Sequence, residues 1–186
     1  MVDPFSSRPS PKLIFGNGVI KELPGETAQL DVKSVLLVTD RGLVKAGHVE
    51  KTSALLQGAG IEVHVYDNVS ENPTESDAED CYHFAKSLSF DGFVALGGGS
   101  SMDTAKASNF LLTNGGRMSD YHGYGKAKNP FLPFVAIPTT AGTGSECQSY
   151  ALLSRDGSHE KMACGCLLYT SDAADEGLGV DLGGRR

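Results

Sequence analysis

A run of three glycines followed by serines is the strongest chemical signal in the sequence. The segment Leu96–Lys106 reads LGGGSSMDTAK, and an apolar run leads into it. This order predicts a strand, a sharp glycine turn and a helix that begins at Ser100 or Ser101. The first N–H groups of a helix have no partner within the helix, and the helix dipole favours negative charge beside them. Gly98, Gly99 and Ser100 are therefore predicted to bind a phosphate or pyrophosphate group.

The glycine run does not define a ligand by itself. It matches neither the GxGxxG fingerprint nor the Walker A loop. A glycine turn can also simply connect a strand to a helix without binding a ligand. Asp103 would lie in the first helical turn, where a carboxylate favours the helix dipole. There it would either cap the helix or contact the ligand, and the sequence leaves both alternatives open.

A second candidate is Asp40, which directly follows the apolar run Val35–Thr39. A carboxylate at the carboxyl end of a strand can accept both ribose hydroxyls of an adenosine, and it repels a 2′-phosphate. Asp40 therefore favours NAD as the cofactor, with NADP possible. It precedes the glycine run in the sequence, so the usual Rossmann order is not met. The local alternative is a turn or N-cap residue.

A third segment, Ile137–Glu146, reads IPTTAGTGSE and follows an apolar run. The hydroxyls of Thr139, Thr140 and Thr143 are predicted to line a cofactor cleft at the carboxyl edge of a sheet. Thr143 and Glu146 also have the spacing of a helix capping box. A cap alone would not explain the two preceding threonines.

Alternating strands and helices position these segments. Four short apolar runs bounded by turn residues are predicted to be buried strands: 35–38, 61–65, 93–96 and 134–137. A fifth, short strand is predicted at 12–15. The clearest helix has an apolar stripe of Ala78, Cys81, Tyr82, Ala85 and Leu88, preceded by a Thr74–Asp77 capping box. This alternation predicts a doubly wound α/β fold with a mostly parallel, Rossmann-like sheet.

Composition places the chain among ordinary soluble proteins and narrows its partners. Its 186 residues are 40% hydrophobic and 21% charged, with a net charge of −7. This acidity disfavours nucleic acid or an anionic membrane surface as a partner. No apolar run approaches the roughly 20 residues of a membrane span, and the first residues do not resemble a signal peptide. The four cysteines lack CxxC spacing, so we expect a reducing, cytoplasmic compartment.

The last residues differ in character from the rest. From Cys166 onward the sequence follows no periodicity set by the preceding segments, and it resembles the translation of a sequencing-library adapter. We therefore expect a dinucleotide-binding domain over residues 1–165 and a non-native tail over residues 166–186. A natural, variable C-terminal tail is the alternative.

Together the two long motifs, with Phe15–Gly18 (FGNG) near the start, resemble the iron-containing, group III alcohol dehydrogenase family over about residues 11–165. The resemblance implies a dinucleotide-binding domain followed by an all-helical domain that holds Fe²⁺ or another divalent metal through one Asp and three His. It also implies hydride transfer between nicotinamide and a primary or secondary alcohol. The substrate would be a small alcohol or aldehyde, and the full-length enzyme a homo-oligomer.

The resemblance also assigns roles to single residues along the cofactor. Asp40 would meet the adenosine ribose, and Gly98, Gly99 and Ser100 the pyrophosphate. Thr139, Thr140 and Thr143 would lie along the cofactor toward the nicotinamide. Lys161 would contact the ribose on the nicotinamide side, and Asn72 would lie near the cofactor. Lys161 is alternatively a surface lysine, and Asn72 a turn residue before Pro73.

Nothing in the sequence matches the metal ligands of the family. The five histidines are dispersed, without ligand spacing: His48, His64, His83, His122 and His159. We assign no metal ligand and no catalytic residue, and we expect this chain alone, as an N-terminal fragment, to be catalytically incompetent. Two alternatives stay open: a zinc-dependent relative of the glycerol or glycerol-1-phosphate dehydrogenase type, and a non-enzymatic nucleotide-binding module.

Overall fold

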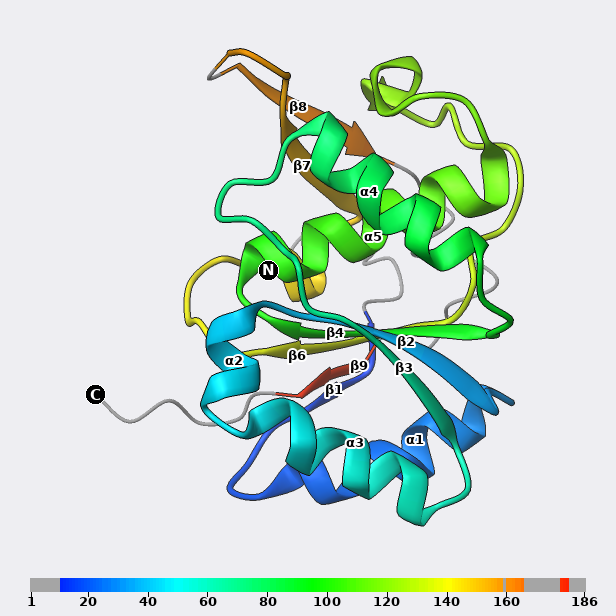
Figure 1. The fold of residues 1–186 in the computed structure, drawn as a ribbon, viewed down its shortest axis with the longest axis vertical. Helices are drawn as coiled ribbons and strands as arrows, with labels where there is room; N and C mark the ends of the chain where they lie inside the picture. Colours follow the sequence, from blue (N-terminus) through cyan, green and yellow to red (C-terminus); the bar gives the residue numbers. More distant parts are fainter. Residues whose placement is uncertain (1–10, 159, 166–177, 181–186) are drawn as a thin grey trace, which may run out of the picture.

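The structure is a computed structural model that describes residues 11–158, 160–165 and 178–180. Over these residues the chain is built in four layers (Figure 1). From the bottom of that view upward they are a pair of helices, a six-stranded sheet, a second pair of helices and a three-stranded sheet.

The six-stranded sheet is parallel at every described pairing. Its strands are β1 (Leu13–Ile14), β2 (Ser34–Val38), β3 (Glu62–Tyr66), β4 (Gly92–Gly97), β6 (Phe134–Pro138) and β9 (Leu178–Val180). Their order across the sheet is β1-β9-β6-β4-β2-β3. The four predicted apolar runs all form strands, with β3 one residue later than expected, and the predicted α/β class is confirmed.

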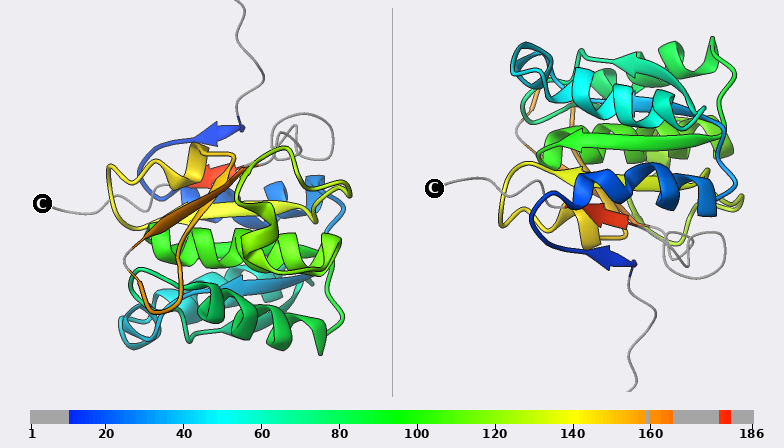
Figure 2. Two further views of the ribbon diagram at one scale, coloured as in Figure 1. Left: turned by 90° about the horizontal axis from the view of Figure 1, so that it is seen from above. Right: turned by 90° about the horizontal axis from the view of Figure 1, so that it is seen from below.

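Two longer helices cover each face of this sheet (Figures 1 and 2). On one face lie α1 (Leu23–Gln29) and α3 (His48–Gly58), and on the other lie α4 (Glu75–Lys86) and α5 (Gly99–Asn114). The short helices are η1 (Val19–Glu22), α2 (Arg41–Lys45), η2 (Met118–Tyr121) and η3 (Ser145–Cys147). No helix among the described residues is long and apolar enough to cross a membrane.

The chain reverses its direction across the sheet at β2. After β2 it passes through α3 to the edge strand β3, and then returns through α4 to β4 on the other side of β2. Because the crossovers are right-handed, α3 and α5 leave the neighbouring strands β2 and β4 toward opposite faces. The carboxyl ends of β2 and β4 therefore form a topological switch point, where ligands bind in folds of this kind.

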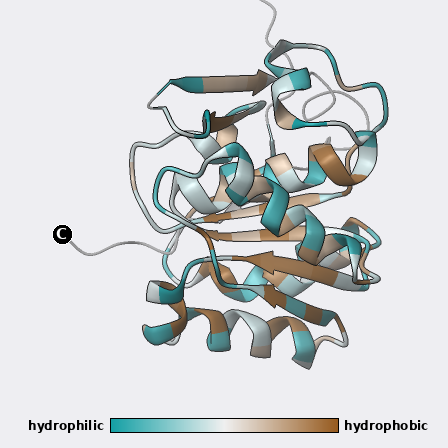
Figure 3. Cartoon of the chain, turned by 45° about the horizontal axis from the view of Figure 1, so that its top comes forward, coloured by the Kyte–Doolittle hydropathy of each residue, from teal (hydrophilic) through white to brown (hydrophobic). Residues whose placement is uncertain are grey.

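A small sheet buries α5 from the side away from the large sheet. It consists of β5 (Gly123–Tyr124), β7 (Tyr150–Ser154) and β8 (Lys161–Gly165), and β7 and β8 pair antiparallel. Every residue from Ser101 to Leu111 of α5 is buried as a result. Figure 3 shows brown, apolar strands at the centre and a mixed teal and brown α5 beside them. The sequence analysis did not predict this sheet.

The strand β9 lies within the segment predicted to be a non-native tail. It pairs with β1 on one side and β6 on the other. Residues 166–177 and 181–186 lie outside the described residues, so the boundary at residue 165 stays a prediction.

The start of α4 confirms the predicted capping box. The Thr74 N–H donates to Asp77 Oδ2 at 2.8 Å, and the Asp77 N–H donates to Thr74 Oγ1 at 3.3 Å. Burial raises the pKa of Asp77, but hydrogen bonds from the Thr74 N–H and from the hydroxyls of Ser70 and Thr74 outweigh it, so the pKa is lowered overall. The carboxylate form of Asp77 therefore stabilises the helix start.

We expect Asp77→Asn to lower the free energy of unfolding by about 1 kcal/mol near neutral pH, as the loss of a helix cap usually does. The folded-state pKa of Asp77 lies below its ordinary value, so the contribution of the charge is complete above about pH 4 and is lost as the pH falls through the folded-state pKa. Urea unfolding at several pH values should show the difference shrinking in acid. Asp80→Asn, at an exposed position of the same helix, is the control, and an equal loss there would contradict the prediction.

Candidate cofactor site

The N-terminus of α5 opens at the switch point without a side-chain cap. Gly98 is the N-cap residue of this 16-residue helix, and no side chain donates or accepts a capping hydrogen bond there. The first N–H groups are therefore directed at whatever lies beyond the helix end. The helix begins at Gly99, earlier than predicted, because the glycines themselves adopt the turn. Asp103 consequently lies past the first turn, and the alternative that it caps the helix is wrong.

The glycines before α5 are required by their surroundings. Gly97 has a φ of +151°, and a Cβ on it would overlap the Ser101 hydroxyl. A Cβ on Gly98 would lie 3.2 Å from Thr140 Oγ1. Thr140 belongs to the threonine loop, by which we mean residues 139–149 between β6 and β7. This loop thus closes over the helix start, and only a residue without a side chain leaves space between them.

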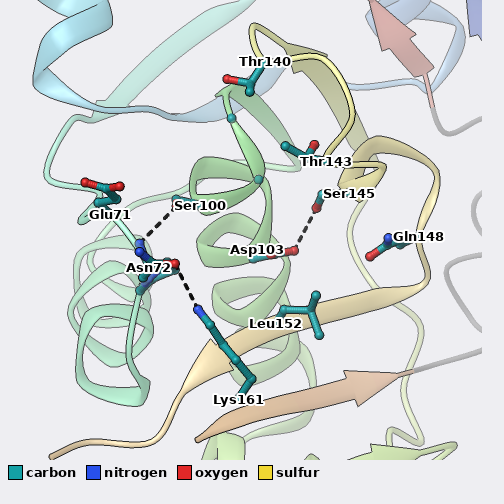
Figure 4. Close-up of a pocket in the computed structure, with 13 residues that line it drawn as sticks. Glu71, Asn72, Ser100, Asp103, Thr140, Thr143, Ser145, Gln148, Leu152 and Lys161 are labelled. Carbon is teal, nitrogen blue, oxygen red and sulfur yellow. Dashed lines mark hydrogen bonds between the residues drawn. The ribbon is translucent and has the colours of Figure 1, made fainter. Parts of the chain in front are cut away.

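Two hollows meet at the start of α5. The Lys161 hollow has a volume of about 480 Å³ and is shown in Figure 4; its lining is Glu71, Asn72, Pro73, Gly98, Gly99, Ser100, Asp103, Thr140, Thr143, Ser145, Gln148, Leu152 and Lys161. The Asp40 hollow has about 490 Å³ and is lined by Asp40, Gly42, Leu43, Val69, Ser70, Glu71, Gly98, Ser100, Ser101, Thr139 and Thr140. Since Gly98 and Ser100 line both, the two hollows form one groove that passes over the uncapped helix end.

Asp40 has a structural role as well as a place in the groove. It is the N-cap of α2, and its Oδ1 accepts hydrogen bonds from the N–H groups of Gly42 at 2.7 Å and Leu43 at 3.1 Å. The N-cap alternative is therefore confirmed. Both bonds end on one oxygen, and the side chain still lines the Asp40 hollow, so capping and contact with a ribose are compatible.

Asn72 links three parts of the chain at the Lys161 hollow. It has a left-handed φ of 53°, which asparagine tolerates better than most residues. Its N–H donates to Ser100 Oγ at 3.3 Å, and Lys161 Nζ donates to its Oδ1 at 3.2 Å (Figure 4). The residue is thus more than a turn residue before proline, and it holds Lys161 at the groove.

Buried polar groups of α5 hold the threonine loop. Ser145 Oγ donates to Asp103 Oδ1 at 2.8 Å, and Lys106 Nζ lies 3.8 Å from the same oxygen. Burial raises the pKa of Asp103, opposed by the charge of Lys106 and the Ser145 hydrogen bond. Burial lowers the pKa of Lys106 to about 8, against the opposing charge of Asp103. Lys106 is therefore still mostly an ammonium at neutral pH.

The groove brings all ten predicted cofactor residues together at one edge of the sheet. These are Asp40, Asn72, Gly98, Gly99, Ser100, Asp103, Thr139, Thr140, Thr143 and Lys161. That they contact a cofactor stays a prediction. Sequence reasoning did not single out several residues that line the groove, among them Glu71, Ser145, Gln148 and Leu152, or the buried Lys106 beside it. The burial of Lys106 could have been inferred from its position, because it is a charged residue within a helix segment of mostly small and apolar residues.

The capping box predicted from Thr143 and Glu146 does not form. The helix there is the three-residue η3, and its N-cap is Gly144 with a φ of 67° and no side-chain cap. Thr143 Oγ1 instead donates to Glu146 Oε2 at 3.4 Å. The glycine turn places Thr143 beside the start of α5, where the residue lines the Lys161 hollow.

The parallel sheet, its switch point and the groove over an uncapped helix end are the features of a Rossmann-like α/β domain. A sequence model of the iron-containing alcohol dehydrogenase family matches residues 10–174, and the chain belongs to this family.

Individual relatives agree with this assignment. The chain is 41% identical over 150 residues to Alcohol dehydrogenase 4 of Schizosaccharomyces pombe, covering 81% of this chain and 36% of that protein. Its structure is similar to that of a 1,3-propanediol oxidoreductase, with a TM-score of 0.84, 30% identity and coverage of 96% of this chain and 46% of the other. Sulfoacetaldehyde reductase from Bifidobacterium kashiwanohense in complex with NAD⁺ gives a TM-score of 0.79 and 28% identity, over 97% of this chain and 46% of that one. The chain thus spans less than half the length of these relatives.

The iron named in the family's description has no ligand set in the part of the chain that the structure describes. No three His, Cys, Asp or Glu side chains gather there as a metal site would require. The described residues therefore do not fit a metal ion.

We expect Gly97→Ala to lower the free energy of unfolding by roughly 1–3 kcal/mol, because alanine is strained at this φ and its methyl group would displace the Ser101 hydroxyl. Gly58→Ala is the matched control in α3, where a Cβ would meet nothing within 4 Å. That substitution should be neutral or stabilise by about 0.4–1 kcal/mol. Chemical denaturation of both variants tests the difference, and equal stability would contradict it.

Proposed function

We propose that this chain binds NAD along the groove and supplies the cofactor half of a metal-dependent alcohol dehydrogenase. The observation that carries the proposal is the pair of hollows on either side of an uncapped helix N-terminus. A dinucleotide has the same form, with two nucleosides joined by a pyrophosphate. The pyrophosphate would lie at the start of α5, between Gly98 and Ser100, with one nucleoside on each side.

The two hollows differ in a way that assigns the two nucleosides. The Asp40 hollow offers a carboxylate to the adenosine ribose. The Lys161 hollow offers the apolar side chain of Leu152 to a nicotinamide ring, and the ammonium of Lys161 to its ribose or to the pyrophosphate. Lys161 and the N–H groups of α5 would together supply positive potential in a chain whose net charge is −7.

When the cofactor is bound, its nicotinamide ring would accept or donate the hydride. The residues of this chain would bind the cofactor and hold it in one orientation, with the threonine loop and Asn72 as the walls of the groove. Positioning of this kind lowers the barrier because the reacting carbon is held in place before reaction. For the whole protein we propose a small alcohol or aldehyde as the substrate and a homo-oligomeric assembly. We also propose a cytoplasmic compartment, with which the free thiols of Cys81, Cys147 and Cys164 agree.

NADH titration of this chain separates the proposal from a non-enzymatic nucleotide-binding module, which has no reason to prefer NADH over ATP. We expect the chain to bind NADH more tightly than ATP. Gly98→Ala should weaken NADH binding about tenfold or more, because the added methyl group keeps the pyrophosphate from the helix N–H groups. Fluorescence titration measures both effects. Gly58→Ala, remote from the groove, is the control, and an unchanged affinity in Gly98→Ala would place the pyrophosphate elsewhere.

Asp40→Asn tests the choice between NAD and NADP. Asparagine retains Oδ1 as the acceptor for the N–H groups of Gly42 and Leu43, so the cap of α2 is kept while the charge is removed. We expect the affinity for NADPH relative to NADH to rise by about tenfold, because the repulsion of a 2′-phosphate is lost. Parallel titrations with both nucleotides give the ratio. A tenfold preference of the unaltered chain for NADPH would refute the assignment of Asp40.

A further inference from the structure

Lys106 is a buried ammonium close to the groove but outside its lining. It lies in the second turn of α5, and only 3% of the residue is exposed. Lysine is almost never fully buried unless its charge is paired or hydrogen-bonded. Neither hollow includes Lys106 among its lining residues. Its burial therefore needs an explanation other than direct contact with a bound nucleotide.

The partners of Lys106 belong mostly to the threonine loop and the residue that follows it. The three N–H groups of Nζ are shared among four acceptors: the backbone oxygens of Ser145 at 2.5 Å, Gln148 at 3.0 Å and Tyr150 at 3.0 Å, and Ser145 Oγ at 3.0 Å. Asp103 Oδ1 lies 3.8 Å away on the preceding turn of the same helix. One charge thus joins α5 to several backbone positions at the end of the loop.

The loop has little regular backbone hydrogen bonding of its own. Its described turn bonds run from Cys147 N to Gly144 O at 3.0 Å and from Gln148 N to Ser145 O at 3.3 Å. Gly142 and Gly144 both have left-handed φ angles, 87° and 67°. A loop of this kind can adopt other conformations unless side chains fix it. The side-chain hydrogen bonds that tie it to α5 come from Lys106 and, at 2.8 Å, from Ser145 Oγ to Asp103.

The same loop forms one wall of the cofactor groove. A Cβ on Gly98 would lie 3.2 Å from Thr140 Oγ1, and one on Gly99 would lie 3.6 Å from Thr143 Cβ. Ser145 and Gln148, whose carbonyls Lys106 holds, line the Lys161 hollow (Figure 4). The Asp40 hollow includes neither residue. The position of the loop therefore shapes the Lys161 hollow more than the Asp40 hollow.

We propose that Lys106 is a positioning residue that holds the threonine loop against α5 and so keeps the Lys161 hollow ready for the second half of the dinucleotide. This inference rests on the proposed binding of NAD. Lys106 acts through the loop, and its partners fix the loop before the ligand arrives. A ligand that fills both hollows then binds without the cost of ordering the loop.

Removal of the Lys106 ammonium should weaken the binding of ligands that occupy the Lys161 hollow more than the binding of ligands confined to the Asp40 hollow. Lys106→Met retains the length of the side chain but leaves the carbonyls of Ser145, Gln148 and Tyr150 without their donor. The fraction of chains with the loop in place then falls, and the apparent affinity falls with it. AMP should fill only the Asp40 hollow, where the loop contributes Thr139 and Thr140 at the end remote from the partners of Lys106, so its affinity should change much less. A general loss of stability would weaken NADH and AMP alike.

The test compares Lys106→Met, Lys106→Arg and Lys51→Met, an exposed lysine of α3 on the far face of the sheet. NADH and AMP affinities are measured by titration, and amide hydrogen exchange of residues 139–149 is measured without nucleotide. We expect Lys106→Met to weaken NADH binding about tenfold, to change AMP binding less than about twofold and to speed exchange in this loop. Lys106→Arg should recover part of each effect, and Lys51→Met should match the unaltered chain.

Two results would overturn the proposal: unchanged loop exchange in Lys106→Met, or equal losses of NADH and AMP affinity with faster exchange throughout the chain. Lys106→Gln, which retains two donors, gives the same comparison if Lys106→Met does not fold. Should the unaltered chain fail to bind NADH, the proposed function falls. The exchange measurement still decides whether Lys106 holds the loop, so the two failures are distinguishable.

Discussion

The burial of α5 between two sheets is the constraint on which the rest of the structure depends. A helix covered on both sides cannot shift along its axis without disturbing both layers, because Met102 packs on the large sheet and Phe110 on the small one. Its N-terminus is therefore fixed at the switch point between β2 and β4. The uncapped N–H groups at that end keep a constant position relative to both hollows, which is what recognition of a pyrophosphate requires.

Three buried polar side chains of α5, those of Asp103, Lys106 and Asn109, find hydrogen-bond partners outside the helix, next to the two ends of β6. Asn109 Nδ2 donates to Leu132 O at 2.9 Å, and Leu132 N donates to Asn109 Oδ1 at 3.0 Å, just before β6 begins. Lys106 and Asp103 hold the threonine loop after β6 ends. A buried polar group that loses its partner is costly. These hydrogen bonds therefore favour a single position of α5 along β6. The core thus specifies the geometry of the groove.

Features that depend on a few neighbouring residues could be predicted from the sequence, whereas features that depend on contacts between distant residues could not. Apolar runs located the buried strands, and the Thr74–Asp77 pair located the start of α4, because both signals lie within a few residues. The β7–β8 hairpin was missed because its short strands have mixed burial. Lys106 was missed because lysine is usually exposed, and its partners lie 39 to 44 residues away. Lys161 was predicted, but its contact with Asn72, 89 residues away, follows from no local pattern.

Among the described residues, those that line the groove all belong to one stretch of the chain. Every residue that lines the two hollows lies between Asp40 and Lys161, inside the part that the family model matches. The proposed cofactor contacts therefore all fall within this stretch, whereas no three potential metal ligands gather among the described residues. A division of this kind would let one nucleotide-binding unit be joined to different substrate-binding parts, since a fold does not by itself fix a function. In agreement with this, the structurally similar proteins are named for different substrates, 1,3-propanediol and sulfoacetaldehyde.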